Sequence, residues 1–100
     1  MVGRLALVVA TPPERGDCER AERLARAARR HGLDVDVFLM AEAAGFAADA
    51  RAAGLVEDGC EVVVCGTNFG ERTAASGVVV GSQDDHARMV ARADRVVALT

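Results

Sequence analysis

The sequence predicts an α/β fold with three layers, α/β/α, in which a mainly parallel sheet of about five strands lies between helices. Short apolar segments alternate with helix-forming segments along the chain, and this order is typical of strands joined by right-handed helical crossovers. The runs at residues 5–10 and 62–64 are continuously apolar, as in parallel strands covered on both faces. The length of 100 residues fits one domain, so we predict a single domain over residues 1–100.

The first half of the chain is predicted to contain two strands and their crossover helices. Residues 5–10 form the first strand, and Asp17 is a plausible N-cap for a helix through Arg30. Four apolar residues of that helix have the spacing of an inward stripe: Ala21, Leu24, Ala25 and Ala28. Residues 34–40 alternate before they turn apolar, so we expect a strand with an exposed beginning, near a sheet edge. Residues 41–58 contain two glycines and predict one broken helix or two short ones.

The middle of the chain predicts a strand, a loop and a second strand. Residues Glu61–Cys65 include three successive valines, which favour an interior place in the sheet. Asn68 and Glu71 have the spacing of a weak capping box, which predicts a short helix that ends before Gly77. Residues 78–80 then form a short fourth strand.

The last quarter of the chain predicts a helix and a final strand. Ser82 and Asp85 form a stronger capping-box pair for a helix through Ala93. Its inward stripe is expected to consist of Ala87, Val90 and Ala91. Residues Arg95–Leu99 follow as the fifth strand.

The composition excludes several kinds of chemistry. The chain has no lysine, which removes Schiff-base catalysis and a phosphate-loop lysine. The net charge is −3 and the arginines are spread among acidic residues, so nucleic acid is not predicted as a partner. Three cysteines, two histidines and no Cys-x-x-Cys motif give no support for a metal site or a disulfide framework. No cofactor is predicted.

Size and hydropathy lead to expectations about location and assembly. The apolar run at residues 5–10 is too short for a signal-peptide core or a membrane span. We therefore expect a cytoplasmic protein with reduced thiols that does not bind a membrane. A chain this small leaves much apolar surface uncovered, and self-association would cover it. We predict a homo-oligomer.

Cys65 is the candidate nucleophile. It ends the third predicted strand, and open α/β sheets bind ligands outside the carboxyl ends of their strands. The loop after it is expected to shape the surroundings of the thiol through Gly66, Thr67, Asn68 and Arg72. Backbone amides and a guanidinium are groups that can lower a thiol pKa. The alternative is that Cys65 is a small buried core residue and Arg72 a solvated loop charge.

The other two cysteines have simpler interpretations. Cys18 begins the first helix near the same edge of the sheet and is a candidate auxiliary or resolving thiol. The alternative, which we favour, is a surface cysteine in a first helical turn. Cys60 enters the third strand at its opposite end, so we interpret it as structural.

Three segments together resemble the DsrE-like family of small sulfur-relay and sulfur-metabolism proteins. They are residues 62–67 (VVVCGT), 77–82 (GVVVGS) and 93–97 (ADRVV). The resemblance implies a DsrEFH-like α/β/α fold, homo- or hetero-oligomers, and a persulfide sulfur carried on Cys65. Some relatives have a second cysteine three positions after the first, where this chain has Asn68. A local two-thiol redox cycle is therefore not expected.

These observations leave functions of different classes open. The resemblance implies a sulfur carrier or sulfurtransferase that uses Cys65, with sulfur donor and acceptor proteins as partners. A non-catalytic oligomeric module that binds a ligand or has a regulatory role also fits, and in it Cys65 is structural. A thiol redox sensor is a third and weaker hypothesis, because Asn68 stands where a nearby thiol would be.

Overall fold

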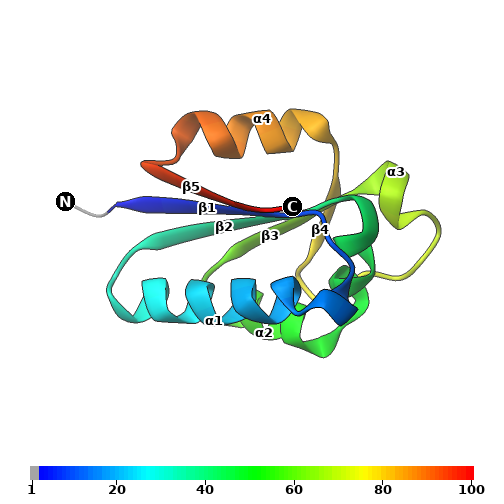
Figure 1. The fold of residues 1–100 in the computed structure, drawn as a ribbon, viewed down its shortest axis with the longest axis horizontal. Coiled ribbons are helices and arrows are strands. Elements are labelled where there is room, and N and C mark those ends of the chain that lie inside the picture. Colours follow the sequence, from blue (N-terminus) through cyan, green and yellow to red (C-terminus); the bar gives the residue numbers. More distant parts are fainter. Residues whose placement is uncertain (1–2) are drawn as a thin grey trace.

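The computed structural model describes residues 3–100, which form one parallel sheet with helices on both faces (Figure 1). The strand order is β4-β3-β2-β1-β5, and every neighbouring pair is parallel. The strands are β1 Arg4–Val9, β2 Asp34–Leu39, β3 Glu61–Cys65, β4 Val79–Gly81 and β5 Arg95–Leu99. The predicted α/β/α class with a parallel sheet of five strands is confirmed.

Helices cover the two faces of the sheet unequally. α1 and α2 lie on one face, and α4 lies on the other (Figure 1). The α-helices are α1 Asp17–Arg30, α2 Ala50–Glu57, α3 Gly66–Phe69 and α4 Gln83–Arg92, and the 3₁₀ helices are η1 Pro13–Arg15 and η2 Ala41–Ala48. η2 and α2 occupy the segment for which the sequence predicts one broken helix or two short ones. Among residues 3–100, no helix combines the length and the apolar character needed to cross a membrane.

The sheet separates two apolar clusters. The larger cluster lies between the sheet and the helices α1 and α2, and it contains Val62 and Val64 of β3. The smaller cluster lies on the α4 side and consists of Phe38, Val63, Cys65 and Met89, with Met40 packed against it. Because successive side chains of a strand point to opposite faces, β3 contributes to both clusters. Its interior position between β2 and β4 is as predicted.

β2 is the central strand, so the prediction that it lies near an edge is wrong. Two polar residues suggested an exposed beginning: Asp34 is half exposed at its side chain, but Asp36 is 0% exposed. Its carboxylate accepts hydrogen bonds from Arg4 in β1 and from Arg92 in α4. Burial of a charged group is tolerated when it is paired and hydrogen-bonded, and two arginines distant in sequence meet that requirement here.

α1 has the predicted bounds but differs from the prediction in three residues. Gly16 is its N-cap, whereas Asp17 accepts a hydrogen bond from the hydroxyl of Thr11 at 2.6 Å. Leu24 is 42% exposed and does not belong to the inward stripe. Cys18, which we favoured as a surface residue, is 2% exposed and packs in the larger cluster.

α4 begins with the predicted capping box. The hydroxyl of Ser82 accepts from the backbone N–H of Asp84, and the carboxylate of Asp85 accepts from the backbone N–H of Ser82. The predicted inward stripe is wrong, because its three residues are all exposed: Ala87, Val90 and Ala91. The residue of α4 that is buried against the sheet is Met89.

Candidate thiol site

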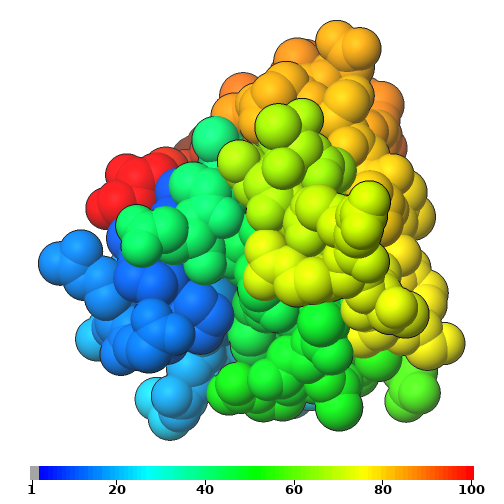
Figure 2. Space-filling model, turned by 90° about the vertical axis from the view of Figure 1, so that its right-hand side faces the viewer, coloured from blue at the N-terminus to red at the C-terminus, as the bar shows by residue number. Residues whose placement is uncertain are grey.

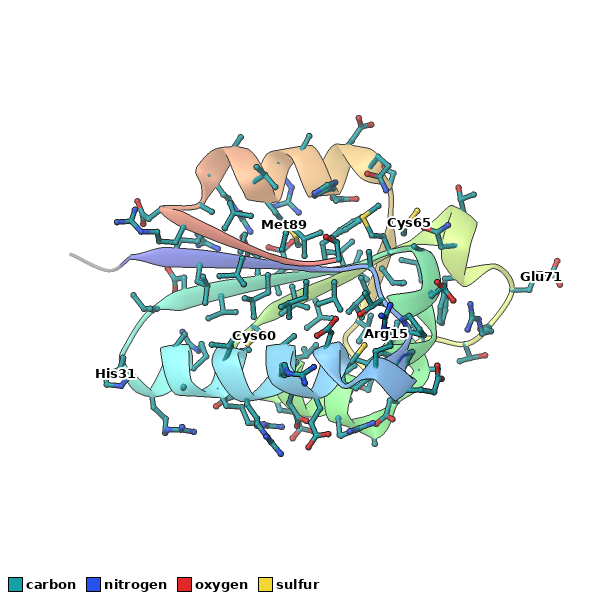
Figure 3. All side chains as sticks on the ribbon, viewed as in Figure 1. Arg15, His31, Cys60, Cys65, Glu71 and Met89 are labelled. Carbon is teal, nitrogen blue, oxygen red and sulfur yellow. The ribbon has the colours of Figure 1, made fainter. Side chains whose placement is uncertain are left out.

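Cys65 is the last residue of β3 and lies at the carboxyl edge of the sheet, on the side covered by α4 (Figure 3). Its neighbour in β4 is Gly81. On the other side, Leu39 pairs with Val64 and the chain stays extended through Met40, so Met40 lies level with the thiol. The thiol side chain is therefore placed between a glycine and a flexible methionine.

The thiol is covered in the folded subunit. Cys65 is 5% exposed and packs with Phe38, Val63 and Met89. Figure 2 shows this end of the molecule closed by η2 in green, by the α3 region in yellow-green and by the start of α4 in orange. Residues 3–100 contain no detectable pocket. Access to the sulfur therefore requires that one of the covering side chains or segments moves.

Three of the four residues predicted to surround the thiol lie in α3, and one of them contacts η2 through a hydrogen bond. Gly66, Thr67 and Asn68 lie in α3, directly after Cys65. The predicted capping box is wrong, because Asn68 is inside this short helix. Its side-chain oxygen instead accepts a hydrogen bond from the backbone N–H of Ala41 at 2.9 Å. Ala41 has a positive φ of 50°, so Asn68 satisfies the amide of a residue in an unusual backbone conformation.

Arg72 closes the turn after α3. Its guanidinium donates to the backbone carbonyls of Asn68 and Phe69, at 3.0 and 2.8 Å, and lies over the Phe69 ring. Phe69 belongs to the larger cluster, on the opposite side of the sheet from Cys65. The guanidinium is thus engaged by this turn, and its predicted role in binding an anion near the thiol stays a prediction.

Cys18 and Cys60 lie apart from Cys65 in the other apolar cluster. Burial raises the pKa of each of these two thiols to about 11. At neutral pH a thiol with that pKa is about 0.01% thiolate, which is the reactive form. Cys60 is buried in the core, which agrees with its interpretation as a structural residue, and the structure does not bring Cys18 together with Cys65.

Several residues around the thiol are not identifiable from the sequence. Met40 and Met89 cover Cys65 only because of strand register and of the way α4 lies on the sheet. His86 of α4 stacks on Phe38, with ring centroids 5.0 Å apart and an interplanar angle of 14°. For Met40 alone the sequence offers a signal, because residue 40 ends a predicted strand and so is expected at the same edge of the sheet as Cys65. Among residues 3–100, no group of three metal-ligating side chains is found.

Comparison with known proteins identifies the fold. The ychN protein from E. coli, a DsrE-like protein, matches 99% of this chain and 100% of its own chain with a TM-score of 0.83. The chain has a DsrE-like fold. Sequence identity to ychN is 20%, so this likeness concerns the architecture. No protein-family model and no curated protein matches the sequence.

The DsrE-like fold confirms the architecture that the sequence resemblance implied. In this fold, the segment VVVCGT contains the end of the interior strand β3 and the start of α3. The segment GVVVGS contains edge strand β4 and the N-cap of α4. Two of the three segments that suggested the family therefore lie side by side around Cys65.

Proposed function

We propose that this DsrE-like protein carries sulfane sulfur as a persulfide on Cys65. The observation that carries the proposal is the position of Cys65 at the carboxyl edge of an interior strand of a DsrE-like fold. This is the edge at which α/β sheets place their chemistry. We propose a cytoplasmic location, where thiols stay reduced, and association of the chain with copies of itself.

Comparison of the three thiols supports Cys65 as the carrier. Cys18 and Cys60 are held in the larger cluster with pKa values of about 11, so both are almost fully protonated at neutral pH. Cys65 adjoins Gly81, which has no side chain to cover it, and Gly66. In the sequence, Cys65 and Gly66 directly precede the exposed residues Thr67 and Asn68.

The covering of Cys65 can open without unfolding of the sheet. Met40 is partly buried and lies beyond the end of β2. A methionine has three rotatable side-chain bonds and changes rotamer at low cost. We propose that rotation of Met40, together with a small displacement of α3, gives a donor access to the sulfur.

The proposed reaction consists of two exchange steps at sulfur. The Cys65 thiolate attacks the outer sulfur of a donor persulfide, which forms the Cys65 persulfide and releases the donor thiol. A thiolate of an acceptor protein then attacks the outer sulfur of this persulfide. That step transfers the sulfur and regenerates the Cys65 thiol. No electrons are gained or lost overall, so no redox cofactor takes part.

Loading of the reduced protein with a persulfide donor tests the proposal. Intact mass should increase by about 32 Da in the wild type and in a Cys18→Ser/Cys60→Ser variant, and not in Cys65→Ser. Subsequent incubation with an acceptor thiol should remove the added mass. Absence of a Cys65-dependent adduct, when a known carrier is labelled in parallel, would contradict the proposal.

A non-catalytic binding or regulatory module is the second candidate function. The observation in its favour is the burial of Cys65, which is 5% exposed among Phe38, Val63 and Met89. In this case Cys65→Ser would retain assembly and ligand binding, and the native thiol would resist alkylation. Cys65 is then a packing residue.

A further inference from the structure

β4 is an edge strand that exposes two apolar side chains. It pairs with β3 on one side and has no strand on the other among residues 3–100. Val79 and Val80 are 50% and 52% exposed. Val79 pairs with Val63, on the α4 side of the sheet, and Val80 pairs with Val64, on the α2 side. Apolar surface is therefore exposed on both faces of the same edge.

Apart from its short length of three residues, the β4 edge lacks the features by which proteins prevent edge-to-edge association. Edge strands present free backbone N–H and C=O groups, and charged side chains, proline or bulges normally block pairing with another strand. Residues 77–81 (GVVVG) contain no charge and no proline. By contrast, the other edge strand, β5, begins with Arg95 directly after Asp94.

We infer that a second copy of this chain docks on this edge, with the two β4 strands antiparallel about a twofold axis at Val80. A strand can pair with its own copy about such an axis only in the antiparallel orientation. The register that pairs all three residues of β4 places Val80 opposite Val80 and Val79 opposite Gly81. Paired residues in this register point to the same face, so the ten strands form one continuous sheet.

The β4 edge is self-complementary, and this property favours a second copy of the chain as its partner. The segment that offers free backbone groups and branched apolar side chains is itself an extended, uncharged strand. Two copies therefore satisfy each other's backbone groups and cover each other's valines, and no charge is brought against a like charge at the axis.

The inferred interface adjoins the candidate thiol. Gly81 of β4 pairs with Cys65 of β3, and the inferred register brings Val79 of the second copy beside Gly81. The second copy thus forms part of the rim around the thiol. The interface does not depend on reaction at Cys65, so association through β4 can be tested separately from sulfur transfer.

Sedimentation equilibrium of single variants tests whether the β4 edge mediates association. We expect the wild type to form dimers or larger even assemblies, and Val80→Lys to raise the dissociation constant at least about tenfold. Val96→Lys is the matched control, because Val96 is a 44% exposed valine on the other edge strand, and it should change the constant by less than about twofold. Circular dichroism verifies that both variants are folded.

Mixing of two oppositely charged variants tests whether Val80 of one copy faces Val80 of the other across the twofold axis. Val80→Glu and Val80→Lys should each associate weakly alone, because like charges face each other across the axis. An equal mixture should restore association, since the introduced carboxylate of one copy then faces the introduced ammonium group of the other. A monomeric wild type, association unaffected by Val80→Lys, or a mixture no stronger than its components would each overturn the inference.

Discussion

Arg92 of α4 donates two hydrogen bonds to the carboxylate of Asp36 in β2, each 2.9 Å long. Asp36 is 0% exposed and also accepts from Arg4 of β1 at 2.9 Å. Two neighbouring strands and the helix above them therefore meet at one buried charge. This contact attaches the C-terminal end of α4 to the centre of the sheet, while Met89 and the capping box fix the rest of the helix.

Asp36→Asn should reduce the free energy of unfolding by about 2–4 kcal/mol, because it removes the buried charge that accepts from Arg4 and Arg92, and these keep only the more exposed Asp34 and Glu61 as ion-pair partners. Asp34→Asn is the matched control. Asp34 also contacts Arg4 but is 49% exposed at its side chain, so its substitution should cost less than about 1 kcal/mol. Urea unfolding measures both values. Equal effects of the two substitutions would contradict this account of the buried contact.

Ser82→Ala should destabilise the protein by about 1 kcal/mol, because it removes the side-chain acceptor for a free N–H of the first turn of α4. Ser76→Ala, in the exposed loop before β4, should have an effect within about 0.5 kcal/mol of zero. Thermal or urea unfolding measures the difference. A Ser82 effect no larger than that of Ser76 would show that the cap contributes little to stability.

Stability should decrease as the pH falls below about 4.5, in part through Glu61. Hydrogen bonds from Arg88 and then Arg92 lower the pKa of Glu61 below its ordinary value of 4.5. A carboxylate with a lowered pKa in the folded state contributes stability that is present above its unfolded pKa and is lost as the pH falls through the folded pKa. Glu61→Gln should therefore flatten the acid limb of a plot of unfolding free energy against pH. An unchanged slope would contradict this role.

Asn68→Ala should increase the rate at which Cys65 is alkylated in the folded protein. The substitution removes the hydrogen bond from the backbone of Ala41 to α3, which is worth about 1 kcal/mol and corresponds to an approximately fivefold larger open population. Thr67→Ala, at the exposed neighbouring position, is the control and should leave the rate unchanged. Mass spectrometry of the alkylated protein measures both rates, and equal rates would exclude α3 as a gate.

Features that depend on short stretches of sequence were predictable. The capping box of α4 was predicted correctly because Ser82 and Asp85 act within one helical turn. The continuous apolar runs of β1 and β3 likewise indicated strands covered on both faces. The position of Cys65 at the carboxyl end of an interior strand followed from the same reasoning.

Features that depend on distant contacts were not predictable. The alternation of Asp34 and Asp36 with apolar residues suggested a strand near an edge, yet β2 is central. Arg4 and Arg92, 32 and 56 residues away from Asp36, neutralise its buried carboxylate. The apolar stripe of α4 predicted the wrong inner face, because Met89 and the arginine contacts orient the helix. The covering of Cys65 by Met89 and Met40 also arises only when strand register and the place of α4 are fixed.

The most direct test of the central proposal compares alkylation of Cys65 and Cys60 in the same native protein at increasing urea concentration. Both thiols are 5% exposed, but they lie at opposite ends of β3. We predict that Cys65 reacts rapidly without urea, through local opening, whereas Cys60 reacts only at the rate set by global unfolding. Reaction of both cysteines at that global rate would contradict a sulfur-carrying role for Cys65.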